Sequence, residues 1–208
     1  MMQDQKIRIR SDYELEIRKK EFLLICNILE KLKINFFLQT GILLGAIRDN
    51  ELIKWDWDVE ISVFGEEFIK RIDEVAEELK KNKFKILTVN KKRNDSKIDF
   101  VGYFDESVTG YTIFSWYHSK IRKAYWRREY SVPEKYFQNL SKINFLGREF
   151  NCPNNPKDYL SYAYGDWRTP IRTSVKNEYN TQKFKNKKIY KFLEFIKTIK
   201  RALYKLKI

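Results

Sequence analysis

The sequence predicts a domain of the α/β or α+β class, in which short strands alternate with amphipathic helices and a C-terminal helix follows. Apolar residues recur at three- and four-residue spacing over 12–32 and 66–82, which indicates amphipathic helices. Short β-branched and aromatic runs stand between and after them and are typical of buried strands. The order of these elements by itself fits an α/β domain as well as an α+β one.

The expected elements follow one another with local start and stop signals. Ser11 or Asp12 is a candidate N-cap for the first helix, and Asp49-Asn50 breaks the helical turn over 42–48. Pro156 suits the first position of a late helix that Gly165 would end. The other expected elements are strands at 35–38, 59–64, 84–89 and 98–104, β pieces at 109–114 and 123–126, a hairpin ending at 145–148, a helix over 154–164 and a terminal helix over 189–206.

Composition excludes several classes of protein. The 208 residues contain seven Gly, four Pro and two Cys, which rules out collagen-like, low-complexity and disulfide-scaffold proteins. No apolar run reaches the roughly 18–20 residues that span a bilayer, and Met1–Arg10 is charged where a signal peptide would be apolar. We therefore expect a cytoplasmic protein, either free or peripheral on the inner face of the membrane.

The charge is concentrated in the C-terminal tail. The formal net charge is +14, and residues 183–208 carry +9 of it. Such a tail favours an anionic partner. An apolar face opposite a Lys-rich face fits a helix lying on an anionic membrane surface, and it fits equally a helix packed on protein. No sequence string typical of RNA-binding modules is present, so nucleic acid is not an expected partner.

Alternating acids form the most informative stretch. Asp56, Asp58 and Glu60 would point to one face of an extended segment, while Val59 and Ile61 would face the core. Like charges at this spacing repel unless a cation lies among them, and Mg²⁺ prefers carboxylate oxygens and phosphates. An ordinary edge strand with acids on its water side is the alternative.

Two further features favour a metal or phosphate site near this stretch. Asp99 stands between apolar residues in the next plausible central strand, where an unpaired charge is costly. Gly41 and Gly45 follow a short strand and allow close approach of a ligand to the backbone, and the helical turn after them offers free N–H groups to an anion. Arg48 could add a bidentate phosphate contact.

Four motifs in order resemble the LicD/fukutin-related family: GILLGAIR, WDWDVEI, KIDF and NPKDYLSYAYGDWRTP. The resemblance spans about residues 35–170. It implies a nucleotidyltransferase-type α+β fold, with a small mixed sheet flanked by helices. We therefore expect a catalytic domain over 1–182, and the basic amphipathic helix 183–208 follows it as a C-terminal extension. It also implies the residue roles. Asp58, Glu60 and Asp99 would be catalytic and metal-binding, with Mg²⁺ or Mn²⁺ as cofactor, and the substrate-binding residues would be Gly41, Gly45, Arg48, Asp56 and Asp166.

The activity implied is transfer of a phospho-alcohol (phosphocholine, ribitol phosphate or glycerol phosphate) from a CDP-activated donor. The acceptor would be a hydroxyl of a cell-surface glycan, lipid-linked glycans included, and CMP would leave. Two positions depart from the family pattern: Ile42 replaces Thr or Ser, and Glu60 replaces Asp. The alternatives are a nucleotidyl transferase of the same fold and an inactive, membrane-associated binding module.

Overall fold

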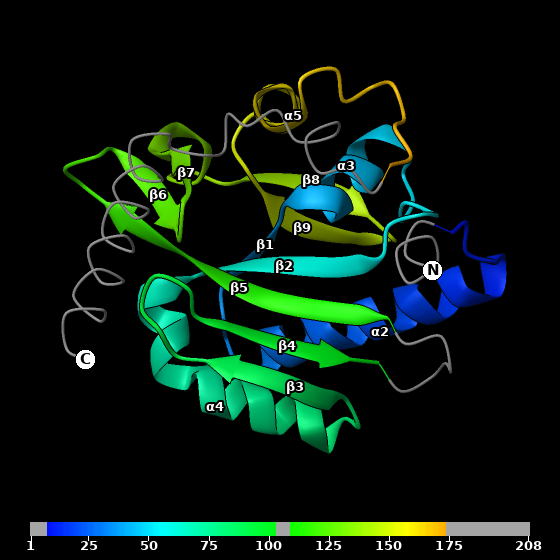
Figure 1. Ribbon diagram of the computed structural model, residues 1–208, viewed down its shortest axis with the longest axis horizontal. Helices are drawn as coiled ribbons and strands as arrows, with labels where there is room; N and C mark the ends of the chain where they lie inside the picture. Colours follow the sequence, from blue (N-terminus) through cyan, green and yellow to red (C-terminus); the bar gives the residue numbers. More distant parts are fainter. Residues whose placement is uncertain (1–7, 103–108, 174–208) are drawn as a thin grey trace, which may run out of the picture.

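The computed structural model describes residues 8–102 and 109–173, and its centre is a mixed β-sheet (Figure 1). The strand order is β1-β2-β5-β4-β3. Only β2 and β5 run parallel; the other neighbours in this path are antiparallel. These strands are β1 (Phe36–Leu38), β2 (Asp58–Phe64), β3 (Lys85–Asn90), β4 (Lys97–Val101) and β5 (Gly110–Ser119).

Two long helices cover one face of this sheet. They are α2 (Asp12–Lys31) and α4 (Gly65–Lys81). Ser11 and Glu14 form a capping box at the start of α2. Alternate residues of the strands point at these helices, so the larger core consists of Val59, Ile61, Ile98 and Ile113 with the apolar faces of α2 and α4.

Among residues 8–102 and 109–173, the second core covers the opposite face at one end only. The far half of β5 pairs with β6 (Ala124–Arg127), which pairs with β7 (Tyr130–Pro133). A second core joins this ribbon to α5 (Pro156–Tyr164) and to α3 (Thr40–Arg48), through residues such as Phe114, Trp116 and Tyr159. The short helix η1 (Glu134–Tyr136) and the hairpin of β8 (Ser141–Phe145) and β9 (Arg148–Cys152) complete the described part. The near half of the face, around the start of β2, lies outside this second core.

A buried polar junction ties the two cores together. Gln39 is fully buried between β1 and α3, and its Oε1 accepts hydrogen bonds from Ser62 Oγ (2.6 Å) and Trp116 Nε1 (2.8 Å). Its Nε2 donates to the Tyr159 hydroxyl. Because each of these groups would be costly if buried without a partner, one side chain fixes the positions of β2, β5 and α5 relative to one another.

The expected fold class is confirmed: a small mixed sheet is flanked by helices. Helix α2 ends one residue earlier than expected, and β5 runs five residues past the expected end at Phe114. No helix within 8–102 and 109–173 is long and apolar enough to cross a membrane. The expected helix over 189–206, and with it the division at residue 183, lies outside the described residues.

Candidate active site

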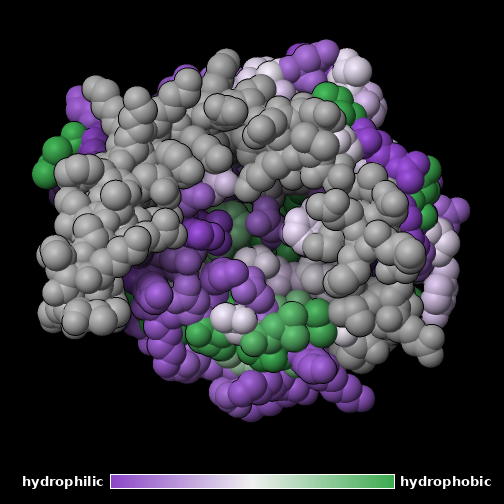
Figure 2. Space-filling view, in the orientation of Figure 1, coloured by the Kyte–Doolittle hydropathy of each residue, from purple (hydrophilic) through white to green (hydrophobic). Residues whose placement is uncertain are grey.

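The half of the sheet face that lies outside the second core carries the acids of β2. Cross-strand register places Asp58 opposite Gly110, and Glu60 opposite Thr112 on β5. Thr112 is in turn opposite Asp99 on β4. Residues opposite one another across paired strands share a face, so all three predicted carboxylates lie on the same side of the sheet. Figure 2 shows a hollow near the centre of the view, with both hydrophilic and hydrophobic residues in and below it.

Asp56 lies in the turn just before β2, pressed against the start of α3. A Cβ added to Gly41 would stand 2.1 Å from Asp56 Oδ2, so only glycine leaves room for this carboxylate. Gly41 therefore lets the Asp56 side chain approach the backbone closely, and substrate binding by Gly41 and Asp56 stays a prediction. The turn itself is held by Arg18, whose Nη1 donates to the backbone carbonyl of Asp56 at 2.8 Å.

Burial and mutual repulsion disfavour the charged forms of these acids. Burial, Glu60 and Asp56 together raise the pKa of Asp58 to about 8. Burial raises the pKa of Asp56 to about 6, although the nearby Arg18 opposes the shift. Asp56 and Asp58 both have a raised pKa and lie close together. When both are ionised, the site carries more negative charge than its surroundings stabilise.

Buried cations beneath the acids offset part of this charge. Arg18 is 1% exposed, and its Nε and Nη2 have no hydrogen-bond partner among the described residues. Burial lowers the pKa of Arg18, and Asp56 and Asp58 oppose that change. Burial and Arg18 lower the pKa of Arg10 to about 10. The sequence interpretation missed this pair, although Arg18 interrupts the apolar face of α2 between Leu15 and Phe22, and that interruption is a signal.

Asp99 has partners of its own. Its Oδ1 accepts from Thr112 Oγ1 at 3.0 Å, and its Oδ2 lies 2.5 Å from Lys97 Nζ. Two strand spacings of about 4.8 Å separate its strand from that of Glu60. Across residues 8–102 and 109–173, no three His, Cys, Asp or Glu side chains are grouped as a metal site. Metal binding by Asp58, Glu60 and Asp99 therefore stays a prediction.

The remaining predicted site residues lie away from this face or serve the fold. A Cβ on Gly45 would stand 2.4 Å from the carbonyl oxygen of Glu51, so Gly45 lets the chain pack back on α3. Arg48 forms a bidentate ion pair with Asp49 at the end of α3 and lies over the ring of Trp55. Asp166 is exposed and accepts from Thr169 Oγ1 at 2.7 Å. Substrate binding by these three stays a prediction.

With this geometry in place, the family description "LicD/FKTN/FKRP, nucleotidyltransferase domain" matches residues 33–155. The match covers more than half of the chain. The chain belongs to this family. The motifs GILLGAIR, WDWDVEI and KIDF all fall inside the match, and NPKDYLSYAYGDWRTP begins at its end.

Two curated relatives support the assignment. Ribitol 5-phosphate transferase FKRP of Mus musculus and that of Homo sapiens are each 25% identical over 150 residues. The alignment covers 68% of this chain and 30% of each relative, so the chain corresponds to less than a third of either protein.

Solved structures of one enzyme are also similar. The crystal structure of ANT(2″)-Ia with adenylyl-2″-tobramycin is 14% identical, covers 86% of this chain and 94% of its own, and has a TM-score of 0.43. The solution structure of ANT(2″)-Ia is 13% identical, covers 92% and 95%, and has a TM-score of 0.45. At these scores the likeness carries no conclusion about the chemistry of this chain.

This chain departs from the family pattern at Ile42 and Glu60, and the structure explains the first of these. Ile42 is 4% exposed and belongs to the larger core, so its side chain packs inward from α3 and does not line the acidic face. Glu60 lies on the acidic face, in register with Thr112, so the longer arm keeps its charge beside Asp58.

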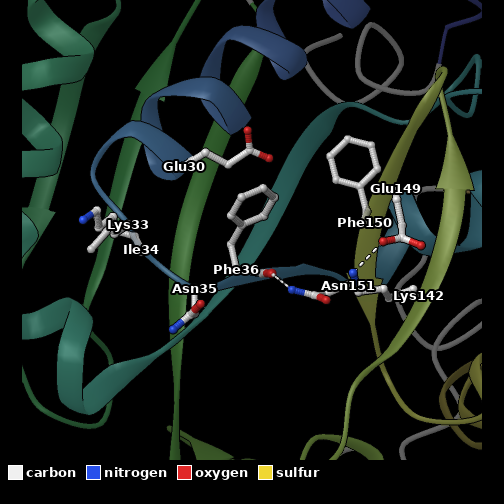
Figure 3. Close-up of a pocket in the computed structure, with 9 residues that line it drawn as sticks. All are labelled: Glu30, Lys33, Ile34, Asn35, Phe36, Lys142, Glu149, Phe150 and Asn151. Atoms are coloured by element: carbon white, nitrogen blue, oxygen red, sulfur yellow. Dashed lines mark hydrogen bonds and ion pairs between the residues drawn. The ribbon is translucent and has the colours of Figure 1, made fainter.

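A separate groove lies between α2, β1 and the β8–β9 hairpin (Figure 3). It has a volume of about 300 Å³. Asn151 Nδ2 approaches the carbonyl oxygen of Phe36 there at 3.5 Å, and Lys142 pairs with Glu149 at its rim. Phe36 is opposite Val63, five residues along β2 from Asp58, so this groove is at the other end of the strand from the acids.

The electrostatics of Asp58 predict a pH-dependent effect of its removal. The raised pKa means that the folded, metal-free protein holds a proton that the unfolded chain releases near pH 4, so stability falls as pH rises from about 4 to about 8. In Asp58→Asn this loss disappears. We measure the melting temperatures of the variant and the wild type in EDTA. We expect the variant's melting temperature relative to the wild type's to be higher at pH 9 than at pH 5 by about 3 °C or more.

The matched control is Asp73→Asn, which removes an exposed carboxylate on α4. Its melting temperature should differ from that of the wild type by nearly the same amount at both pH values. An Asp58→Asn difference that stays flat or shrinks with pH would show that Asp58 is not held in a charge-repelling site.

Proposed function

We propose that this chain transfers a phospho-alcohol from a CDP-activated donor to a hydroxyl of a glycan. One observation carries the proposal: in a chain of the LicD/FKTN/FKRP family, Asp56, Asp58 and Glu60 lie close together at the start of β2, where burial and repulsion raise the pKa of two of them. A family-wide transferase character and the printed name of the FKRP relatives support the choice of phospho-alcohol transfer.

The residues present fit a hard divalent cation. Carboxylate oxygens are the ligands that Mg²⁺ and Mn²⁺ prefer, and a cation would relieve the repulsion that raises the pKa of Asp58. Asp58 and Glu60 would hold it, with Asp99 or Asp56 adding a further oxygen. When bound, the cation would neutralise charge on the donor diphosphate.

The protein's own groups position the reactants. The acceptor oxygen forms a bond to the phosphorus that carries the alcohol, the bond from that phosphorus to the bridging oxygen breaks, and CMP leaves with the electron pair. Asp99 would orient the hydroxyl or accept its proton, since Thr112 and Lys97 hold its carboxylate in one position. Arg18 would keep Asp56 and the start of β2 in place.

Product analysis tests this function directly. The full chain is incubated with Mg²⁺, a glycan acceptor and CDP-choline, CDP-ribitol or CDP-glycerol in turn. We expect CMP release with one of these donors, and a loss of at least about 100-fold in rate for Asp58→Asn, because that variant removes an essential charge at the reacting centre. The exposed variant Asp73→Asn should keep full activity.

Two outcomes would replace the proposal. Release of pyrophosphate from a nucleoside triphosphate, with no CMP from any CDP-alcohol, would identify a nucleotidyl transferase, which the family description also allows. Absence of any transfer together with absence of any effect of Mg²⁺ or Mn²⁺ on melting temperature would identify a binding module.

The proposal also includes a cellular location for the protein. The basic segment 183–208 would hold the enzyme on an anionic membrane surface at the cytoplasmic face, near lipid-linked glycans. Sedimentation with vesicles containing phosphatidylglycerol compares the full chain with a chain ending at residue 182. We expect only the full chain to sediment at about 0.1 M salt; equal sedimentation of both would remove the membrane role.

A further inference from the structure

The charge of the sheet face beside the acids changes from negative to positive between one row of residues and the next. Glu60, Thr112 and Asp99 form one row across β2, β5 and β4. The next row on the same face, about 7 Å along the strands, consists of Ser62, Phe114 and Lys97. The first row is acidic, while the second carries a lysine on β4.

A second cation lies over the same row. The guanidinium of Arg127, from the end of β6, stacks on the ring of Phe114 at 4.4 Å. Phe114 and Lys97 are opposite one another across β5 and β4, so Arg127 lies over the residue that pairs with Lys97. The sequence interpretation of residues 105–147 held no motif that singled out Arg127.

Arg127 keeps hydrogen-bonding capacity that the described part of the chain does not use. Its side chain is 15% exposed, and its Nε has no hydrogen-bond partner there. Its Nη2 lies 3.5 Å from Asp95 Oδ1, which is an ion pair without a hydrogen bond. A guanidinium has five N–H donors, so most of the hydrogen-bonding capacity of Arg127 is not used by the described residues.

The acids of the first row attract this guanidinium. Burial lowers the pKa of Arg127, whereas Glu60, Asp95 and Asp99 oppose that change. Lys97 uses one of its three N–H donors on Asp99. A cation bound by the acids would weaken their pull on Arg127 and Lys97, and an anion lying across the two rows would then satisfy both ends of the face.

We propose that Lys97 and Arg127 form an anion subsite that binds the phosphate of the nucleotide part of the donor, the phosphate that leaves as CMP. This inference rests on the proposed function. The phosphorus that is transferred must lie beside the acidic row, where a cation and the attacking hydroxyl meet. The second phosphate of the diphosphate then extends toward the basic row, and the two cations stabilise the negative charge that grows on it as the bond breaks.

Binding of the product isolates this subsite from catalysis. Calorimetry of the full chain with saturating Mg²⁺ compares CMP with cytidine, which lacks the phosphate, for the wild type, Lys97→Gln and Arg127→Gln. We expect each variant to bind CMP about 10-fold or more weakly, since each loses a charge-assisted hydrogen bond, and to bind cytidine as the wild type does. Arg127→Lys should recover part of the CMP affinity.

The chain supplies a matched control. Arg122 also stacks on an aromatic ring, that of Trp126 at 5.7 Å, but it is exposed in the turn between β5 and β6. Arg122→Gln should leave the affinities for CMP and cytidine unchanged. If Arg127→Gln unfolds, Lys97→Gln decides the matter, because Lys97 is 27% exposed and contributes less to packing.

Unchanged CMP affinity in Lys97→Gln and Arg127→Gln would overturn the subsite, and so would an equal loss of cytidine affinity. Inorganic pyrophosphate separates this inference from the proposed function. If no CDP-alcohol is turned over but pyrophosphate binding falls in both variants and not in Arg122→Gln, the anion subsite stands and the proposed donor is wrong.

Discussion

Crowding of negative charge at the start of β2 is the constraint on which the rest of the site depends. Asp56, Asp58 and Glu60 lie within five residues, and burial together with repulsion raises the pKa of the first two. Such an arrangement opposes folding unless cations offset it. The chain supplies Arg18 below the sheet, and the site chemistry favours a divalent cation above it.

The pairing of the mixed sheet places an acidic row of side chains next to a basic one on the same face. Because β2 and β5 run parallel while β4 is antiparallel to β5, residues far apart in the sequence meet in rows across the face. The row of Glu60 and Asp99 is acidic, and the row beside it carries Lys97 and Arg127. A substrate with a diphosphate matches such a face, since its charge can span a bound cation and a fixed basic pair.

The parts of the site that lie on regular strands could be predicted from sequence. Alternation along 56–60 placed Asp58 and Glu60 on one face, because side-chain direction in a strand has a fixed period of two. The pairing of β2, β5 and β4 places Asp99 on that face as well. Helix periodicity located α2 and α4 to within one residue at every end.

The parts that depend on tertiary packing could not be predicted. Arg127 reaches the site because the β6–β7 ribbon folds over Phe114, and no local pattern encodes that approach. Gly45 resembles a ligand-binding glycine in sequence, yet its open side faces the backbone of Glu51. Only the path of the chain after α3 distinguishes these two uses of glycine.

The central claim is that Asp58 lies in a crowded acidic site that binds a divalent cation. Proton release on metal binding tests this claim most directly. With a pKa of about 8, Asp58 is largely protonated at pH 7 in the metal-free protein and must lose that proton to bind a metal ion. Calorimetric titration with Mg²⁺ or Mn²⁺, in buffers of different ionisation enthalpy, should show nearly one proton released per bound ion at pH 7 and almost none at pH 9.5. Binding without proton release at pH 7, or the same binding by Asp58→Asn, would contradict the account.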